Sequence, residues 1–476
     1  MLATCVSLMA TWEAICSTMA AGLISGGPVS LIYGFICMST SSLRSNGVTN
    51  SMQSHCPTTG GQYHYVSILS PQRFRRAMSY VAGWITTFGW QAVAASAPFL
   101  AGTMIQGLLA LNDPDYVFQR WHGTLLYWAV LAIALLVNVA AARLLPAIEV
   151  ATMVLHVGLY IVFLVAMLSL APTKASATSV FTQFTNNSGW SSDGVAWFIG
   201  MLSAAYVLIG YDGATHLSET MAQPAIEVPR AMIGSIAVNA TLGLTFLIVI
   251  IFCIQDLDAA LSTNTGFPII EIFHQITGNR AGATAMSCGV VLMASAATLP
   301  LITSAAWTLQ AFARDYGIPF SRFISRRREK DEVPVVAIMV TVAFLALLGL
   351  LNIASTTAFN AVLSLATVGL YTSYLFPVIL MLYRRVCDQE SLEFGPFRLG
   401  RAGIAVNLVS AIYTTVTSVF LLFPPNQPVT ALNFNYASVI LAGVLVLCAV
   451  YWFWRGRKTY HGLAVQLAGV PAEGAV

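Results

Sequence analysis

Long apolar runs separated by short polar segments dominate the pattern of this chain. A helix that crosses a bilayer needs roughly 20 mostly apolar residues, and eleven runs meet that requirement. We expect these helices at Leu2–Ile24, Ala77–Leu111, Gly123–Ala141, Val150–Leu170, Val195–Gly213, Met232–Ile254, Ala281–Ala311, Val335–Leu351, Ala358–Leu382, Ile404–Phe423 and Ala437–Phe453. The pattern predicts an all-α polytopic membrane protein.

A twelfth candidate, Leu31–His55, begins like the others and then changes character. Residues 34–37 are mostly apolar, whereas residues 39–46 read Ser-Thr-Ser-Ser-Leu-Arg-Ser-Asn. The chain has twelve spanning helices if this segment inserts and eleven if it does not. An altered reading frame in the gene is a further explanation of the polar stretch.

Basic residues gather on one side of the predicted membrane. When Ala77–Leu111 counts as one helix, all but four of the 22 Lys and Arg residues share a side. Arg120, Lys174 and Arg280 lie opposite, and Arg44 lies in the polar segment. Short basic loops face the cytoplasm, so we expect a cytoplasmic C-terminus. The plasma membrane is the expected location, with the vacuolar membrane as the alternative.

Composition excludes most other classes of protein. The 476 residues are 57% hydrophobic and 9% charged, whereas soluble domains carry about 25% charged residues. The net charge of +3 is small and forms no basic stripe, so no nucleic-acid partner is expected. Eight cysteines without a C-x-x-C pair and seven scattered histidines predict no metal, no cofactor and no enzyme. The sequon at Asn186 lies in an outward loop and predicts glycosylation.

Two of the predicted helices carry interruptions. The first contains Thr11, Trp12 and Glu13 in mid-run, and the helix that begins at Val195 reaches Gly210-Tyr211-Asp212-Gly213. Unwound backbone at membrane depth is tolerated where it is buried in protein or lines a cavity. Its free N–H and C=O groups, with the dipole ends of the half-helices, can hold a zwitterion or a cation.

Glu13 and Asp212 are the acidic residues closest to a helix centre. A carboxylate in hydrocarbon costs at least about 2.5 kcal/mol, so both are expected to face the interior. Each is either a structural carboxylate or a counter-ion and proton site, and Asp212 is favoured for the second role. His156 is a candidate for the same proton relay, with a structural interior histidine as the alternative.

The spacing of the two interruptions predicts an internal repeat. If Leu31–His55 spans, each interrupted helix opens a unit of five. We expect a permease domain over residues 1–454. Its first repeat covers about 1–171, its second about 193–383, and two extra helices lie within 404–454. Residues 455–476 would form a short cytoplasmic tail.

Ordered motifs along nearly the whole chain resemble those of fungal permeases. They are Gly26–Ser30 (GGPVS) followed by Tyr33-Gly34, Pro57–His64 (PTTGGQYH), Tyr211–Glu219 (YDGATHLSE), Val228–Met232 (VPRAM), Ala313–Pro319 (ARDYGIP) and Phe394–Phe397 (FGPF). The chain is similar to the amino acid–polyamine–organocation superfamily, in the branch of amino acid, GABA and choline permeases.

This resemblance implies twelve helices, a five-plus-five inverted repeat and proton symport, with substrate held between the first and sixth helices. It also implies unwound segments at residues 11–14 and 209–213. The eighth helix would add Thr303 and Ser304. The expected substrate-binding residues are therefore Thr11, Trp12, Glu13, Gly210, Tyr211, Asp212, Gly213, Thr303 and Ser304.

Two departures from the family pattern stand out, one that bears on the substrate and one in the polar segment, where a frame error or a mis-joined exon in the gene model is a further explanation. The first helix has Ala10-Thr11-Trp12-Glu13 in place of the Gly-x-Gly of typical amino acid carriers. That change puts the backbone pocket for an α-carboxylate in doubt and leaves a cation such as choline or a polyamine open. The acidic residue expected before the Pro-Thr-x-Gly-Gly motif falls at about Ser51.

The predicted function is secondary active transport of an amino acid or a small organic amine such as GABA or choline. The expected partners are that substrate, a proton as coupling ion and the bilayer. The alternatives are a nutrient-sensing receptor with little flux and an exporter of a related metabolite.

Overall fold

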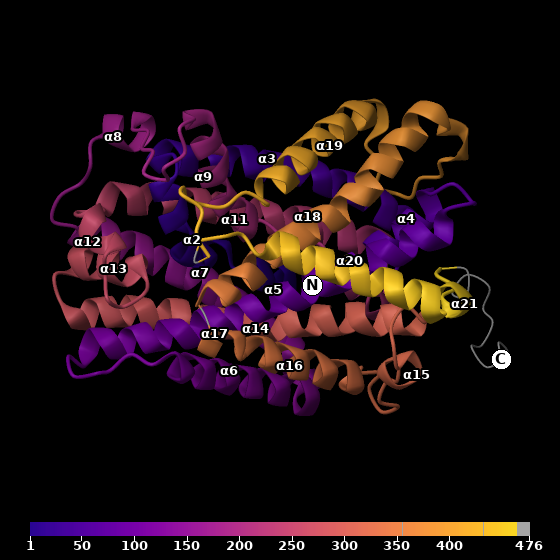
Figure 1. Cartoon of the computed structure of the whole chain (residues 1–476), viewed down its shortest axis with the longest axis horizontal. Coiled ribbons are helices and arrows are strands. Elements are labelled where there is room, and N and C mark those ends of the chain that lie inside the picture. The colour runs from indigo at the N-terminus through magenta and orange to yellow at the C-terminus, as the bar shows by residue number, and fades with distance from the viewer. Residues whose placement is uncertain (355, 432, 464–476) are drawn as a thin grey trace.

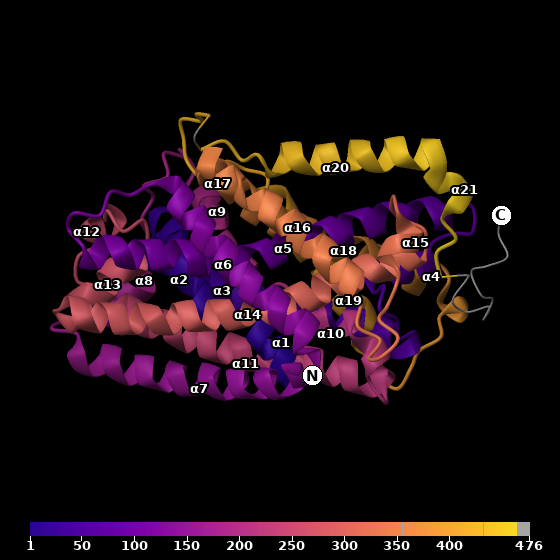
Figure 2. The same ribbon diagram turned by 90° about the horizontal axis from the view of Figure 1, so that it is seen from below.

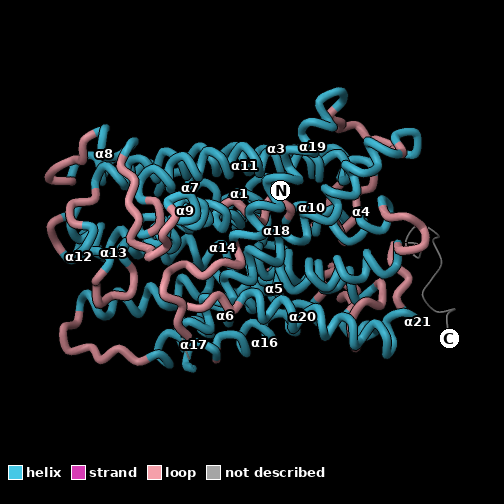
Figure 3. Tube along the Cα trace, turned by 45° about the horizontal axis from the view of Figure 1, so that its top comes forward, coloured by secondary structure: helices cyan, strands magenta, loops and turns pink. Residues whose placement is uncertain are grey.

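The computed structural model describes residues 1–354, 356–431 and 433–463, and its helices run along the long axis of the molecule (Figure 1). In this described part, ten helices are long and apolar enough to cross a bilayer. They are α1 (Leu2–Met9) with α2 (Thr11–Ile24), α5 (Arg75–Asn112), α6 (Arg120–Ala140), η1 (Ala142–Leu144) with α7 (Leu145–Leu170), α11 (Pro224–Cys253), α14 (Arg280–Arg314), α16 (Val335–Gly349) with α17 (Leu351–Ala354), α18 (Thr356–Cys387), η4 (Gly400–Ala402) with α19 (Gly403–Phe420), and α20 (Ala437–Tyr451) with the π-helical η5 (Trp452–Gly456) and α21 (Arg457–Thr459). The all-helical membrane fold is confirmed, and Figure 3 shows helices joined by loops.

Inner and outer helices differ in what their side chains face. We compare the most apolar 18-residue stretch of each span. Of its residues, 72% are buried in the first span and 67% in α14, whereas 17% are buried in the spans of α7 and α20. Val154 and Val165 on α7 and Val446 on α20 are exposed. Figure 2 shows α7 and α20 along opposite edges of the molecule. Apolar side chains at these edges are placed to face lipid tails.

The polar segment forms one continuous helix, α3 (Gly27–His55). Its polar side chains are enclosed by protein, since Asn46, Thr49, Asn50 and Gln53 are fully buried. The helix packs against α11, against α9 (Asp193–Val207) and against α19. Neighbouring helices surround these groups, so low hydropathy does not exclude α3 from the membrane layer.

The interruption of the first helix lies at Ala10, between α1 and α2. Ala10 has φ 40° and ψ 50°, a left-handed conformation. The expectation of unwound backbone over residues 11–14 is wrong, because Thr11 already begins α2. A single left-handed residue redirects the chain, and the Asn239 side chain accepts the hydrogen bond of the freed Thr11 N–H at 3.2 Å.

The second interruption follows α9, which ends at Val207 rather than at Gly213. Residues 208–212 are not helical, and Gly213 begins the short helix α10 (Gly213–His216). Gly210 has φ 83°, in the region that favours glycine. The predicted unwound segment at 209–213 is therefore present over its first four residues.

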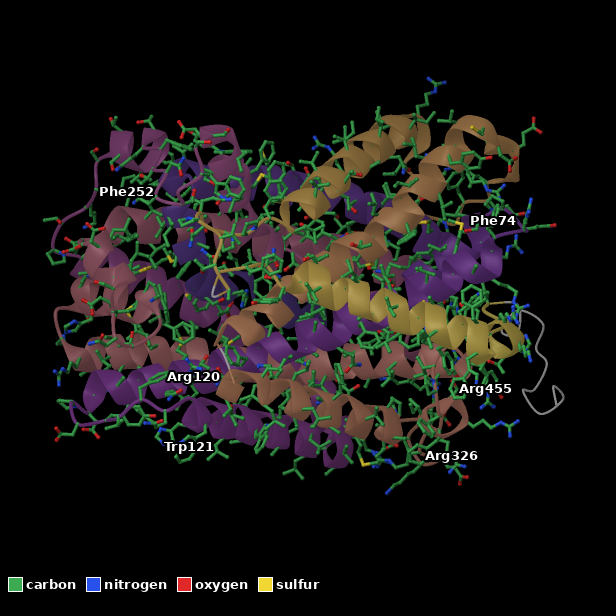
Figure 4. The ribbon with its side chains drawn as sticks, in the orientation of Figure 1. Phe74, Arg120, Trp121, Phe252, Arg326 and Arg455 are labelled. Carbon is green, nitrogen blue, oxygen red and sulfur yellow. The ribbon has the colours of Figure 1, made fainter. Side chains whose placement is uncertain are left out.

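Short helices cap the two ends of the bundle. At one end lie α8 (Ala177–Thr182), α12 (Leu257–Leu261) and α13 (Pro268–Thr277), and at the other α4 (Gln62–Leu69) and α15 (Ser321–Ile324) (Figure 1). The remaining short elements are η2 (Ser218–Thr220) and η3 (Gln389–Ser391). Arg326 and Arg455 lie at the α15 end and Arg120 at the opposite end (Figure 4). The helix α21 continues to Thr459 within the region expected to form the short cytoplasmic tail, residues 455–476; residues 464–476 lie outside the described part.

Gly200 provides a test of how closely α9 and α2 cross. A Cβ at this position would lie 1.7 Å from the Ser25 carbonyl oxygen, so Gly200→Ala has to push two backbones apart. We expect it to cost about 1–3 kcal/mol or more and to lower the thermal midpoint of the purified protein in detergent. Gly158→Ala on α7, where a Cβ meets nothing within 4 Å, is the matched control and should leave the midpoint unchanged or raised. Equal midpoints for the two variants would contradict the close crossing.

Candidate functional site where two helix breaks meet

A small, partly open cavity lies beside both interruptions. Its volume is about 50 Å³, room for a few water molecules. It is lined by Leu8, Met9, Ala10, Glu13, Ala14, Val93, Ser96, Ala97, Leu100, Tyr206, Ile209, Ala294, Ala297 and Leu301. Among these residues Glu13 is the single charged one. The cavity is therefore an apolar pocket with one carboxylate.

Glu13 pairs with a histidine from α7. Its Oε1 lies 2.7 Å from His156 Nδ1, and both side chains are almost fully buried. Glu13 Oε2 and His156 Nε2 have no hydrogen-bond partner. The pair thus keeps one free carboxylate oxygen in a residue that lines the cavity and one free imidazole nitrogen.

The N-terminus of α2 offers less to an anion than the helix dipole alone would suggest. Asn239 from α11 accepts the first N–H, that of Thr11, and the Thr11 hydroxyl donates to the Val207 carbonyl at 2.8 Å. A substrate carboxylate would have to displace the Asn239 amide to reach this N–H. Together with Glu13, this occupied donor favours a cation over a carboxylate in the cavity.

Asp212 lies outside the cavity lining, in a saturated hydrogen-bond network. Its Oδ2 accepts from Gln62 Nε2 at 2.5 Å and from Trp90 Nε1 at 3.2 Å, and its Oδ1 accepts from Tyr374 at 2.6 Å. His216 Nε2 lies 3.2 Å from the same Oδ2. These contacts tie the interrupted segment to α4, α5 and α18.

The contacts of His216 fix a proton count for this pair. Its Nδ1 lies 2.9 Å from the Thr59 carbonyl oxygen, an acceptor, so Nδ1 carries a hydrogen. Nε2 then either carries a second hydrogen that faces an ionised Asp212 or accepts one from a protonated Asp212. In both arrangements the pair of side chains holds one more proton than a neutral histidine beside a carboxylate.

The other predicted residues lie around the cavity rather than on its wall. Trp12 packs against Phe163 and Phe246, and Tyr211 meets the Ser45 hydroxyl at 3.3 Å. Gly210 donates its N–H to Tyr374 at 3.4 Å.

Two glycines and two hydroxyls complete this set. Both glycines lie against Leu8: a Cβ would come within 2.9 Å of its side chain from Gly210 and within 2.8 Å from Gly213. Thr303 donates to Asn138 at 2.6 Å, and the buried Ser304 hydroxyl has no partner. Of the nine residues expected to bind substrate, Glu13 is the one that lines the cavity.

The predicted glycosylation position is engaged by its own loop. Asn186 Nδ2 donates to the Trp190 carbonyl at 2.9 Å and to Asp193 at 3.0 Å. A glycan on this nitrogen would have to replace both hydrogen bonds, and modification of Asn186 stays a prediction.

Several site residues escaped the sequence reasoning. Asn239 stands inside an apolar run, and the Tyr206 ring joins the cavity from the end of α9. Glu149 and Thr152 are buried on the same face of α7 as His156. Their spacing of three, four and seven residues is the signal that could have found this face.

A charged cluster closes the end of the bundle that carries α15. Glu219, just after α10, pairs with Arg314 at 2.6 Å and with Arg327 at 2.6 Å. The Arg327 guanidinium also lies 4.6 Å from the centre of the Trp307 ring. Burial alone would raise the pKa of Glu219, but the two arginines outweigh it and lower that pKa to about 2. The cluster ties the second half of an interrupted helix to α14.

Lipid-facing helices around two interrupted helices that meet at a small cavity define the class, a multi-pass membrane transporter. The family model described as amino acid permease matches residues 2–445. The chain belongs to this family of the amino acid–polyamine–organocation superfamily, whose members are membrane transporters rather than enzymes.

Similar proteins come from several fungi. A Macrophomina phaseolina protein, whose name proposes an amino acid/polyamine transporter, is 33% identical over 91% of this chain and 95% of its own length. The choline transporter of Saccharomyces cerevisiae is 31% identical over 95% of this chain and 80% of its own length. Amino-acid permease 2 of Neurospora crassa is 27% identical over 96% and 84% respectively. The resemblance inferred from the motifs is confirmed.

Glu219→Gln should lower the thermal midpoint at neutral pH, because Arg314 and Arg327 lose their shared carboxylate. Hydrogen bonds to charged groups contribute about 1.5–3 kcal/mol, less here because the cluster is partly exposed and screened by salt. The folded pKa lies below the unfolded value of about 4.3. The stabilisation is therefore complete above that value and is lost as pH falls toward about 2.

The difference in midpoint between wild type and Glu219→Gln should stay constant from pH 8 to pH 5 and shrink below pH 4. Glu227→Gln, at an exposed position without an ion pair among the described residues, is the control. A difference that disappears between pH 8 and pH 6 would contradict the low pKa.

Proposed function

We propose that this permease carries a small organic cation, of the kind represented by choline or a polyamine, as a proton-coupled secondary transporter. The observation that carries the proposal is the Glu13 carboxylate, the single charged side chain on the wall of the cavity. A buried carboxylate needs a partner of opposite charge or a proton. A substrate ammonium group can take that place beside the free oxygen Oε2.

Two features support a cation without a carboxylate over an amino acid. Asn239 occupies the Thr11 N–H that a carboxylate would use, and no basic side chain lines the cavity. The choline transporter of Saccharomyces cerevisiae, 31% identical, and the protein named for amino acid/polyamine transport are in keeping with this substrate class. GABA and other zwitterions remain the alternative substrates.

The proposed coupling ion is a proton. Glu13 and His156 share a hydrogen bond at 2.7 Å, and a proton on Glu13 would neutralise the carboxylate that binds the cation. Arrival of the cation would then move this proton from Glu13 to His156, so that the two side chains hold substrate and proton together, as symport requires. Asp212 and His216 would form a second proton-binding pair, which lies at the start of α10 rather than on the wall of the cavity.

The proposed topology has twelve spans. Two further spans are counted with the ten apolar ones. They are α3, which has 29 residues, and α9 together with α10. Each interrupted helix would then open a five-helix repeat, about 1–171 and 193–383, followed by the two helices within 404–454. The basic end of the bundle, with the C-terminus, would face the cytoplasm, with the plasma membrane as the expected location.

Glu13→Gln should lower the uptake of radiolabelled choline or putrescine in permease-deficient yeast by at least about tenfold. The reason is that the amide cannot balance the ammonium charge. Surface expression is measured in parallel, and Glu227→Gln is the control that should transport normally. Unchanged uptake in Glu13→Gln would remove this carboxylate from the binding site. Substrate binding without uptake in the wild type would instead favour the sensor.

Choline and glycine betaine separate the two substrate classes, because they share a trimethylammonium group and differ in the carboxylate. We expect choline to be taken up and betaine to be excluded. Asn239→Ala frees the Thr11 N–H and should raise the uptake of betaine relative to choline. Equal uptake of both compounds by the wild type would contradict a site that disfavours carboxylates.

His156→Gln tests the proton route in proteoliposomes. An imposed inward proton gradient should accelerate uptake by the wild type, because the Glu13–His156 pair would carry a proton together with the substrate. The variant should retain substrate exchange without a gradient and lose the acceleration. A gradient response that survives in His156→Gln, and in Asp212→Asn, would rule out both carboxylate–histidine pairs.

A further inference from the structure

One buried arginine has no counter-ion among the residues that the structure describes. Arg385, in the last turn of α18, is 6% exposed. Its Nε and Nη2 atoms are buried without a hydrogen-bond partner, and the described residues give it no ion pair. Each buried ion costs several kcal/mol when it is left uncompensated. The neighbouring Arg384, in contrast, pairs with Asp388.

Two neighbours fix the orientation of this guanidinium. The Arg385 Cζ lies 5.2 Å from the centre of the Phe394 ring. On its other side a Cβ built on Gly403 would lie 1.7 Å from Nη1 and 3.1 Å from Nη2. Gly403 is the first residue of α19, so only glycine allows the guanidinium to lie against the start of this helix.

This placement puts two positive ends together. The N-terminus of α19, an 18-residue helix, has no side chain that caps it. The Gly403 N–H donates to the Gly400 carbonyl, but the N-terminal end of the helix still carries about half a positive charge, and a guanidinium beside it adds a full one. Like charges in a buried place require an anion between them or next to them. The unpartnered atoms Nε and Nη2 form the side edge with which arginine grips a phosphate or carboxylate in two parallel hydrogen bonds.

The surroundings favour a lipid as the source of that anion. Ile404, Leu408 and Ile412 on α19 are exposed apolar residues, as are Ile379 and Val386 on α18. These two helices pack on each other, and Figure 1 shows them side by side. The site therefore lies where lipid-facing surface meets the end of the bundle that carries Arg326 and Arg455.

We propose that Arg385 and the N-terminus of α19 form a binding site for the phosphate of an anionic phospholipid headgroup. The two buried nitrogen atoms are closed to water in this conformation, so the headgroup enters as the Phe394 side chain, which lies over the guanidinium, moves aside. Glu390 and Glu393, exposed on the same segment, are the competing partners from within the chain. This site is independent of the transported substrate.

The test uses the full chain purified in neutral detergent. Its thermal midpoint is measured after addition of phosphatidylinositol, phosphatidylcholine or inorganic phosphate, and native mass spectrometry counts bound lipid. We expect phosphatidylinositol to raise the wild-type midpoint and phosphatidylcholine not to do so. An equal rise with inorganic phosphate alone would overturn the lipid as the source.

Arg385→Leu removes the charge and should bind phosphatidylinositol at least tenfold more weakly, without the rise in midpoint. In lipid-free detergent its midpoint should equal or exceed that of the wild type, because an uncompensated charge has been removed. Arg401→Gln, at an exposed neighbouring position, is the control and should keep the lipid response. Arg385→Lys keeps the positive charge but cannot form the bidentate pair of hydrogen bonds. Its thermal midpoint should rise less with phosphatidylinositol than that of the wild type.

Two results would overturn the site. One is a lipid response in Arg385→Leu equal to that of the wild type. The other is a midpoint for Arg385→Leu well below the wild type in lipid-free detergent, since that would mean that Glu390, Glu393 or another internal group already serves the arginine. If Arg385→Leu does not fold, the comparison of Arg385→Lys with Arg401→Gln decides in the same way.

Discussion

The lack of water inside a bilayer is the constraint on which the rest of this structure depends. Each backbone N–H freed by an interrupted helix must find a partner in the protein. Asn239 supplies it for Thr11, and the Tyr374 hydroxyl supplies it for Gly210. Both partners come from helices outside the interrupted pair. The two breaks therefore exist because α11 and α18 hold them open, and their geometry depends on that packing.

The same constraint governs the buried charges. Three histidines, His64, His156 and His216, are fully buried, and each faces a carboxylate: Asp315, Glu13 and Asp212 respectively. A carboxylate paired with Lys or Arg is a fixed ion pair, as Glu219 is with Arg314. A carboxylate paired with histidine can instead become neutral by sharing or receiving a proton. Pairs of this kind are in keeping with the proton coupling that we propose.

Sequence reasoning located the helices and their breaks because apolar length and glycine placement are local properties. It chose Glu13 and Asp212 for the same reason, since an acid within an apolar run is visible in the sequence. It could not separate their surroundings. Asp212 is saturated by donors from three other elements, whereas Glu13 keeps a free oxygen, and such long-range contacts leave no local pattern.

The polar helix α3 shows the limit of hydropathy most clearly. Hydropathy assumes that a spanning helix faces lipid, but Asn46, Asn50 and Gln53 face other helices and are fully buried. The position of the first break was also missed by one to four residues. A left-handed alanine carries no sequence signal, because its conformation is imposed by packing rather than by its own preference.

Leu8 provides a mechanical link between the cavity and the Asp212 network. It lines the cavity, and glycine at positions 210 and 213 lets its side chain lie against the interrupted segment, where a Cβ would come within 2.9 Å and 2.8 Å of it. If the substrate enters this cavity as proposed, it displaces wall residues, and Leu8 has that segment behind it. We infer that substrate entry presses on the backbone that holds Asp212. The charge balance at Glu13 and the position of the half-helix would then change together.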